Sequence, residues 1–86
     1  MKNQMYMENA LINLFKDNPN KKFAVQNVYF DFQKYYNLSD YQKDDDLKYP
    51  QARYKHEIRS FLARLVKKGI IKRLMRGYYI YSKKFD

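Results

Sequence analysis

Apolar side chains in the first part of the chain recur three and four positions apart, which is the spacing of one face of an α-helix. We therefore predict a helix over residues 4–16. The segment DNPN at positions 17–20 ends it, because proline cannot continue the backbone hydrogen-bond ladder and asparagine favours turns. The side chains on the apolar face are Met7, Ala10, Leu11, Leu14 and Phe15.

The same spacing returns after a short interval and predicts a second helix over residues 25–36. Residues 21–24, immediately before it, are expected to form a short edge strand. The segment is rich in β-branched and aromatic residues, which lowers its helix propensity slightly, so packing has to hold this helix. Its apolar face consists of Val25, Val28, Tyr29, Phe32 and Tyr36.

A third and longer pattern predicts a helix over residues 50–68. Pro50 suits the first helical turn, and Gly69 suits the position just beyond the last. This helix is expected to bury one side and to present a mostly basic one. The apolar stripe is Tyr54, Ile58, Phe61, Leu62, Leu65 and Val66. The opposite stripe is Arg53, His56, Ser60, Ala63, Arg64 and Lys67, flanked by Arg59 and Glu57.

Between the second and third helices, the sequence of residues 37–49 predicts a loop with one helical turn after Ser39. The run of aspartates at positions 44–46 invites comparison with a metal site. A calcium-binding loop needs alternating ligands, a central glycine and a distant glutamate, and the run lacks all three. We therefore interpret it as a solvated loop whose acids repel phosphate and bias how a polyanion docks.

Residues 70–82 have the composition of a β-hairpin. Two runs rich in β-branched and aromatic residues, 70–75 and 78–82, are separated by the two residues Arg76 and Gly77, and a two-residue connection with glycine is a hairpin signal. Alternation is imperfect, so the register stays open. We expect Ile71, Ile80 and some of the tyrosines to close the core behind the long helix. The fold class predicted for residues 1–86 is a single, mostly α domain with a small β-hairpin (α+β).

Charge divides the chain into two parts. Seven lysines balance seven acidic residues in positions 1–49, whereas positions 50–86 hold eleven lysines and arginines against Glu57 and Asp86. The whole net charge of +9 therefore lies in the second part. Such asymmetry is typical of proteins that bind polyanions, although a solvated basic surface is the simpler interpretation.

The remaining composition argues against several classes of protein. There is no cysteine and only one histidine, which leaves little material for catalysis, so we expect neither an enzyme nor a bound cofactor. No apolar run approaches the length of a membrane span, and no signal-peptide core follows the first residues. We expect a cytoplasmic protein that does not bind membranes.

Residues 58–81, IRSFLARLVKKGIIKRLMRGYYIY, carry a more specific pattern. Leu62, Leu65, Gly69 and Ile71 match the arrangement L-x-x-L-x-x-x-G-x-I, in which a recognition helix runs into a wing. With the order helix, short strand, helix, loop, long helix and basic hairpin, the chain resembles the winged helix-turn-helix superfamily of DNA-binding domains over almost all of residues 5–82. The resemblance implies three helices and a wing sheet of two or three strands. The run KRLMRGYY also resembles the wing of abortive-infection antitoxins and phage-defence regulators.

One departure concerns the connection between the second and third helices. It has about thirteen residues, where a helix-turn-helix usually has three or four. An insertion so close to the binding face bears on how the domain docks.

The resemblance implies that helix 50–68 lies in the major groove of double-stranded DNA. Arg53 is then the leading candidate for a two-hydrogen-bond contact with guanine. His56 is a candidate for a base edge or a phosphate, although a surface histidine is the commoner interpretation. The short side chains of Ser60 and Ala63 allow close approach to DNA. The candidate DNA-binding residues of this helix are Arg53, His56, Arg59, Ser60, Arg64 and Lys67, with Lys68 as a further phosphate contact.

The hairpin is the corresponding wing. Arg76 and Gly77 form its tip, which suits either a narrow A/T-rich minor groove or a nearby phosphate, and a solvated turn is the plain alternative. Lys72 and Arg73 are candidates for phosphate contacts beside it.

Taken together, the sequence predicts a small DNA-binding transcriptional regulator of a phage, plasmid or defence locus. Specificity in so small a domain favours a homodimer on a repeated half-site, formed through Met1, Met5, Tyr6 and Met7. An alternative is a winged-helix interaction module that places its basic face on an acidic protein, for example as a subunit or inhibitor of a phage or host complex. RNA binding ranks third, because no recognisable RNA-binding sheet motif is present.

Overall fold

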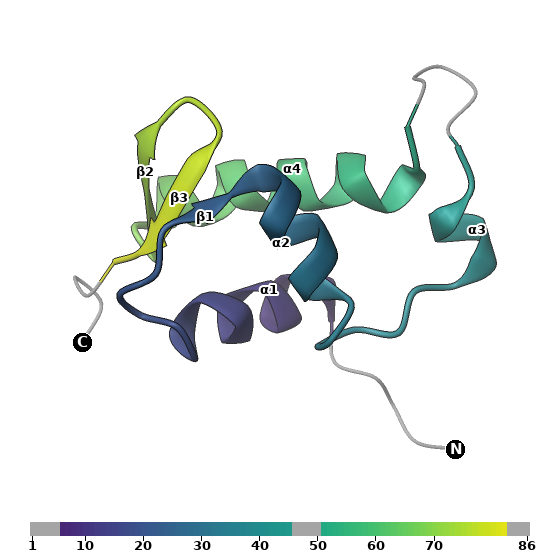
Figure 1. The fold of residues 1–86 in the computed structure, drawn as a ribbon, viewed down its shortest axis with the longest axis horizontal. Coiled ribbons are helices and arrows are strands. Elements are labelled where there is room, and N and C mark those ends of the chain that lie inside the picture. Colours follow the sequence, from purple (N-terminus) through teal and green to yellow (C-terminus); the bar gives the residue numbers. More distant parts are fainter. Residues whose placement is uncertain (1–5, 46–50, 83–86) are drawn as a thin grey trace.

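The computed structural model describes residues 6–45 and 51–82. In these residues the chain forms a small α+β domain with helices α1 (Met7–Lys16), α2 (Val25–Phe32), α3 (Asp40–Lys43) and α4 (Arg53–Lys68). The strands are β1 (Phe23–Ala24), β2 (Ile71–Met75) and β3 (Tyr78–Tyr81). In Figure 1, α4 runs lengthwise across the domain, with the sheet at its C-terminal end and α3 at its N-terminal end.

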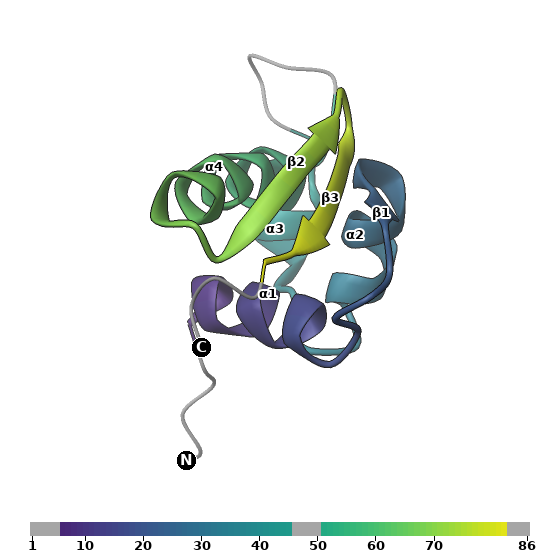
Figure 2. The same ribbon diagram turned by 90° about the vertical axis from the view of Figure 1, so that its left-hand side faces the viewer.

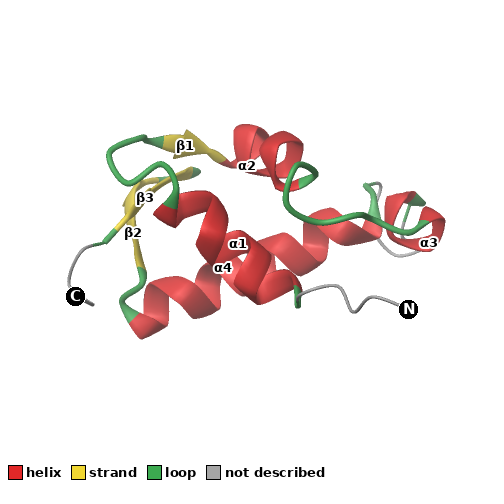
Figure 3. Ribbon diagram, turned by 90° about the horizontal axis from the view of Figure 1, so that it is seen from below, coloured by secondary structure: helices red, strands yellow, loops and turns green. Residues whose placement is uncertain are grey.

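The three longer helices meet around one core. α1 packs against both α4 and α2, and β2 packs against the end of α4. Figures 2 and 3, which view the domain from the sheet end and from below, show the sheet beside the end of α4, and Figure 2 shows α1 below α2 and α4. The largest fully buried side chains are Phe15, Phe23, Phe32, Leu11, Leu14, Ile58, Leu62, Leu65, Ile71 and Val28. Among the described residues, no charged side chain is buried.

The predicted helices form, with corrected ends. Residues 4 and 5 lie outside the described part, and α1 begins at Met7 after Tyr6 in extended conformation. α4 begins at Arg53, and Pro50 again lies outside the described residues. The predicted end of α4 is confirmed: Gly69 has a φ of 81°, and Ile70 N–H donates to the Leu65 carbonyl at 3.0 Å across it.

The prediction that the second helix reaches residue 36 is wrong, because α2 ends at Phe32. The amides of Lys34 and Tyr35 donate to carbonyls three residues earlier, so the chain tightens into turns. Tyr36 still fits the apolar pattern because its ring stacks on Phe32, with ring centres 5.4 Å apart. The apolar spacing typical of a helix therefore extends to Tyr36, although α2 itself ends at Phe32.

The single turn predicted after Ser39 is confirmed as α3. The Ser39 hydroxyl accepts a hydrogen bond from Gln42 N–H, and the Gln42 side chain accepts one from Ser39 N–H, a reciprocal capping arrangement. Such a cap explains why a four-residue helix forms in an otherwise irregular segment. The connection from α2 to α4 therefore spans residues 33–52 and is longer than the sequence indicated.

The sheet has three antiparallel strands in the order β1-β3-β2. The predicted edge strand forms as β1, although it covers only Phe23–Ala24 of residues 21–24, and Phe23 pairs with Tyr79. β2 and β3 form the predicted hairpin, with Gly77 at a φ of 79° in its two-residue turn. The register shifts between Arg73 and Met75, which is a β-bulge at Leu74.

The register settles which hairpin residues reach the core. Phe23, Ile71, Tyr79 and Tyr81 share the inner face of the sheet, and all pack into or against the core. Ile80 pairs with Lys72 on the other face, so the expectation that Ile80 closes the core is wrong.

Candidate nucleic-acid interface

The outer stripe of α4 is exposed as the pattern predicted. Tyr54, Ile58, Leu62 and Leu65 are buried against α1 and α2, which turns the opposite side of the helix outward. On that side Ser60, Ala63 and Lys67 are exposed, and His56 is half-buried. Short side chains at positions 60 and 63 leave the middle of this face open to close approach.

A shallow hollow lies over part of this stripe. It has a volume of about 300 Å³ and is lined by His56, Glu57, Ser60, Phe61 and Arg64. The Gln51 side-chain nitrogen lies 3.4 Å from His56 Nδ1. The structure therefore brings three of the predicted site residues, at positions 56, 60 and 64, to one surface.

Arg53 lies elsewhere and has partners within the protein. Its guanidinium carbon is 4.1 Å from the centre of the Tyr41 ring, and one of its nitrogens donates to the Tyr41 carbonyl at 3.2 Å. Its backbone N–H donates to the Asp44 carbonyl at 3.0 Å. Arg53 thus fastens the start of α4 to the segment that contains α3.

The N-terminal end of α4 also has acidic neighbours. Asp40, Asp44 and Asp45 lie exposed in and after α3, and Asp45 forms a β-bridge with Ala52 just before α4. The Gln42 side chain donates to Glu57 at 3.2 Å, which ties α3 to the first turns of α4. This end of the helix is therefore poorly suited to a phosphate backbone.

The C-terminal half of α4 is basic and partly neutralised from α1. Glu8 accepts a hydrogen bond from Lys68 at 3.0 Å and lies 3.8 Å from Arg64. Lys67, one helical turn from Arg64, contacts no acidic side chain among the described residues. Glu8 therefore limits the positive charge of Arg64 and Lys68 but leaves that of Lys67 free.

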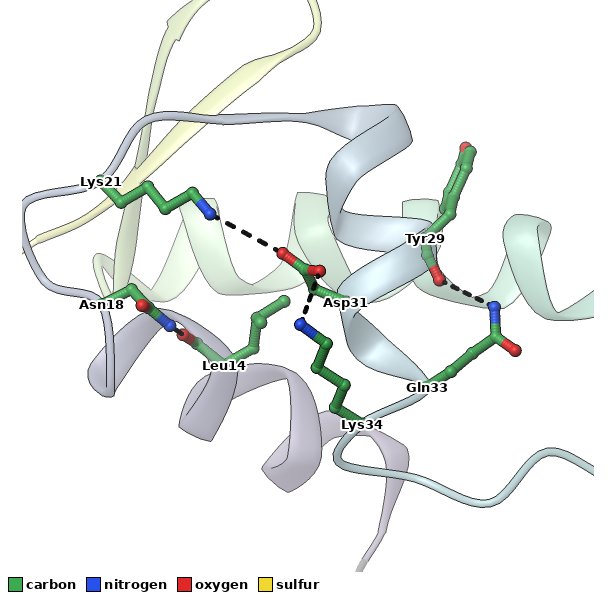
Figure 4. Close-up of polar contacts among 7 residues, drawn as sticks. All are labelled: Leu14, Asn18, Lys21, Tyr29, Asp31, Gln33 and Lys34. Carbon is green, nitrogen blue, oxygen red and sulfur yellow. Dashed lines mark hydrogen bonds and ion pairs between the residues drawn. The ribbon is translucent and has the colours of Figure 1, made fainter.

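A similar ion cluster lies on the other side of the domain. Asp31 on α2 lies 3.8 Å from the Lys21 ammonium and 3.5 Å from that of Lys34, as Figure 4 shows. Like Glu8, it joins two lysine or arginine side chains that are both largely exposed. The two clusters form a natural pair for comparison.

Arg59 lies at the seam between α2 and α4. Burial raises the pKa of the Tyr29 hydroxyl above its ordinary value of 10.0, and the neighbouring Arg59 guanidinium opposes that rise. Lys55 lies over the Tyr29 ring, with its ammonium 5.4 Å from the ring centre. Arg59 is exposed, but it stands beside the central stripe rather than on it.

The hairpin places its basic residues next to the end of α4. Lys72 and Arg73 line a hollow of about 700 Å³ together with Val66 and Gly69 at the helix end. Arg76 is exposed at the turn, whereas the Gly77 carbonyl accepts a hydrogen bond from Val25 N–H at 2.9 Å. The start of α2 therefore braces the turn of the hairpin.

Three exposed apolar residues near this turn were missed as candidate site residues. Leu74, Met75 and Tyr78 are 40%, 59% and 41% exposed, and Met75 and Tyr78 are cross-strand partners. The adjacent pair Leu74-Met75 in a strand otherwise lined by charges was the available signal.

Residues 6–45 and 51–82 hold neither a cluster of metal-binding side chains nor a helix that could span a membrane. These residues contain no group of three or more histidine, aspartate or glutamate side chains placed to hold a metal ion. None of their helices is long and apolar enough to cross a membrane. Comparison with protein families, with curated proteins and with solved structures finds no match for the chain.

Proposed function

We propose that the protein binds double-stranded DNA through the C-terminal half of α4 and the β2–β3 hairpin. One observation carries this proposal. Lys67, Lys72, Arg73 and Arg76 lie exposed on these adjoining elements, and no acidic side chain of the described residues pairs with them. Clustered cations of this kind gain affinity for a phosphate backbone by releasing its counterions.

The arrangement of elements supports a winged helix-turn-helix as the framework. A helix, a short strand, a second helix, a long helix and a hairpin follow in that order, and β1 joins the hairpin to make a three-stranded sheet. The insertion with α3 departs from the usual short turn between the second and third helices. We assign α4 as the recognition helix and the hairpin as the wing.

The insertion that contains α3 shifts the proposed DNA contact toward the C-terminal half of α4. Recognition helices commonly read bases with their N-terminal residues. Here that end adjoins exposed aspartates, and Arg53 is held against Tyr41. The middle and C-terminal half of α4, with Ser60, Lys67 and the wing, therefore face the DNA most directly, and Arg53 contributes to specificity only where it leaves Tyr41.

The biological role proposed with this surface is transcriptional regulation at a phage, plasmid or defence locus, by a homodimer on repeated half-sites. Met7 is buried and contributes nothing to a dimer surface, whereas Tyr6 is exposed. Met1 and Met5 lie outside the described residues. Light scattering on the free protein and on its DNA complex tests the dimer, and a monomer in both states would exclude it.

The proposed function is tested by binding to labelled duplexes of different A/T content over a range of salt concentrations. We expect a dissociation constant of about one micromolar or below near 50 mM salt, with a steep loss of affinity as salt rises. Lys67→Ala should reduce the slope of log affinity against log salt by about 0.9 on every duplex. Arg76→Ala should also remove the preference for A/T-rich duplexes.

A matched control is Lys16→Ala, which removes an exposed lysine from the last turn of α1. It should leave binding close to that of the unaltered protein. Absence of binding near 50 mM salt would reject the DNA proposal and favour the second candidate, an acidic protein partner. The exposed apolar side chains beside the basic turn are the observation that supports this alternative.

A further inference from the structure

The turn region of the hairpin exposes both apolar and basic side chains. Leu74 and Met75 expose apolar side chains, and Arg73 and Arg76 flank them in the sequence with exposed guanidinium groups. Single exposed apolar residues are ordinary, but adjacent ones on a projecting element indicate a contact surface.

A β-bulge lies within this arrangement. Strict alternation along β2 would turn one of two adjacent residues toward the inner face of the sheet. The register shift between Arg73 and Met75 inserts Leu74 without a cross-strand partner, and Leu74 and Met75 are both exposed. Bulges commonly re-aim side chains next to functional sites.

The turn is also held in place before any ligand arrives. Gly77 accepts the Val25 amide hydrogen, and Ala24 pairs with Tyr78 immediately after the turn. A third strand and a helix start thus support the hairpin up to its turn. A preorganised element loses little conformational entropy on binding and can therefore hold an apolar side chain against a stacked duplex.

We propose that Leu74 and Met75 act as an apolar wedge that enters the DNA minor groove and bends the duplex at one base step, an inference that rests on the DNA binding proposed above. Proteins that bend DNA in this way insert Leu, Met or similar side chains between base pairs and kink the duplex by about 20–90°. The flanking arginines give the charge complementarity, since the narrow A/T-rich minor groove attracts cations. Flexible pyrimidine–purine steps such as TA are the expected sites of insertion.

The test measures binding and bending separately. A duplex of about 30 base pairs carries a donor and an acceptor dye at its ends and a central TA step, and a second duplex carries a G·C-rich centre. Fluorescence anisotropy reports binding, energy transfer reports the end-to-end distance, and 2-aminopurine at the central step reports unstacking. We expect the unaltered protein to raise both energy transfer and 2-aminopurine fluorescence on the TA duplex, and less so on the G·C-rich one.

The double variant Leu74→Ser/Met75→Ser should still bind, with affinity lower by about tenfold or less, but leave energy transfer and 2-aminopurine fluorescence at the level of free DNA. Both side chains are exposed, so circular dichroism should show an unchanged fold. Phe30→Ser removes another exposed apolar side chain, from α2, and should alter neither signal. The conservative variant Met75→Leu should retain the bend.

The outcomes separate the wedge from DNA binding itself. Binding by the unaltered protein with no bend and no unstacking would overturn the wedge and leave the proposed function standing. A bend of equal size from the Leu74→Ser/Met75→Ser variant would likewise overturn the wedge and leave the proposed function standing. Failure of the unaltered protein to bind either duplex would overturn both proposals.

Discussion

The guanidinium of Arg53 lies against the ring of Tyr41, with 4.1 Å between its central carbon and the ring centre. The same guanidinium donates a hydrogen bond to the Tyr41 carbonyl. Together with the hydrogen bond from Gln42 to Glu57, this contact joins α3 to the first turns of α4. An arginine that the sequence presents as a base reader thus has a structural role as well.

We expect Arg53→Ala to lower the free energy of unfolding by about 1–2 kcal/mol, through loss of the cation–π contact and the hydrogen bond. Tyr41→Ala should cost about 1 kcal/mol through the cation–π contact alone. Combined in a double-mutant cycle by urea denaturation, the two changes should show a coupling of about 0.5–1 kcal/mol. Strictly additive effects would contradict the contact. If Arg53 also reads bases, Arg53→Ala alone should relax sequence preference, since Tyr41→Ala leaves the arginine available.

Glu8 and Asp31 give a matched test of where polyanion binding occurs. Their side chains are 21% and 18% exposed, and each pairs with two lysine or arginine side chains. Glu8→Gln and Asp31→Asn therefore each remove one negative charge from similar surroundings of two basic side chains. Glu8→Gln frees Arg64 and Lys68 on the proposed face. It should tighten binding at low salt and steepen the salt slope by up to about 0.9.

Asp31→Asn frees Lys21 and Lys34 on the opposite side and should change binding much less, as titrations of both variants against one duplex will show. Both variants should lose only about 0.5 kcal/mol of stability, because the lysines and Arg64 are largely exposed and solvent screens these pairs. Equal gains in affinity would indicate that net charge, and not this face, governs binding.

Much of this surface follows from the sequence, because helical periodicity determines which side of α4 is buried. Leu62 and Leu65 must turn inward together, so Ser60 and Lys67 must turn outward. Gly69 and Gly77 likewise marked a helix end and a turn that need positive φ angles. Local rules of this kind need no knowledge of tertiary contacts.

The features that the sequence did not reveal depend on how neighbouring elements contact one another. Tyr41 reaches Arg53 only because Ser39 caps a turn that swings α3 beside α4. The bulge at Leu74 depends on how β2 pairs with β3, and the exclusion of Ile80 from the core follows from the same register. The predicted end of the second helix at Tyr36 is wrong because the Tyr36 ring can stack on Phe32 from a turn as well as from a helix.

Gly77 should tolerate side chains according to their ability to adopt a positive φ. A Cβ at this position meets nothing within 4 Å, so backbone strain, and not a clash, sets the cost. Gly77→Ala should lower the free energy of unfolding by about 1 kcal/mol, and Gly77→Asn by less, because asparagine enters the left-handed region more readily. Gly69→Ala is the control at a matching φ of 81°, and thermal unfolding of the three variants provides the comparison. Equal losses for Ala and Asn at position 77 would argue against strain as the cause.

Stability at alkaline pH should depend on Tyr54. Burial raises the pKa of its hydroxyl above the ordinary value of 10.0, so the folded protein holds this proton more tightly than the unfolded chain. A raised folded pKa gives stability that is complete below about pH 10 and is lost as pH rises through the folded value. Tyr54→Phe cannot ionise there, so its free energy of unfolding should fall less steeply above pH 10 in denaturant titrations. Parallel curves for the two proteins would contradict this assignment.

The hydrogen bond from Val25 to Gly77 makes a further prediction possible. Val25 is the first residue of α2, a position where proline is well tolerated by a helix. Val25→Pro should therefore keep the helical circular dichroism signal but remove the donor that holds the turn. Hydrogen exchange should accelerate at the amides of β3 much more than at those of α4. Val25→Thr, which retains the amide hydrogen, is the control, and exchange unchanged in the proline variant would show that the bond holds nothing.

The hydrogen bond from Val25 to Gly77 also has a consequence for folding of the chain during its synthesis. No side chain caps the start of α2, and the carbonyl that accepts its first amide hydrogen belongs to a hairpin made much later in synthesis. α2 and β1 therefore lack this hydrogen bond and their pairing with β3 until the hairpin has been synthesised. We expect nascent chains that stop before Tyr78 to remain open to proteases, and the domain to become resistant in one late step.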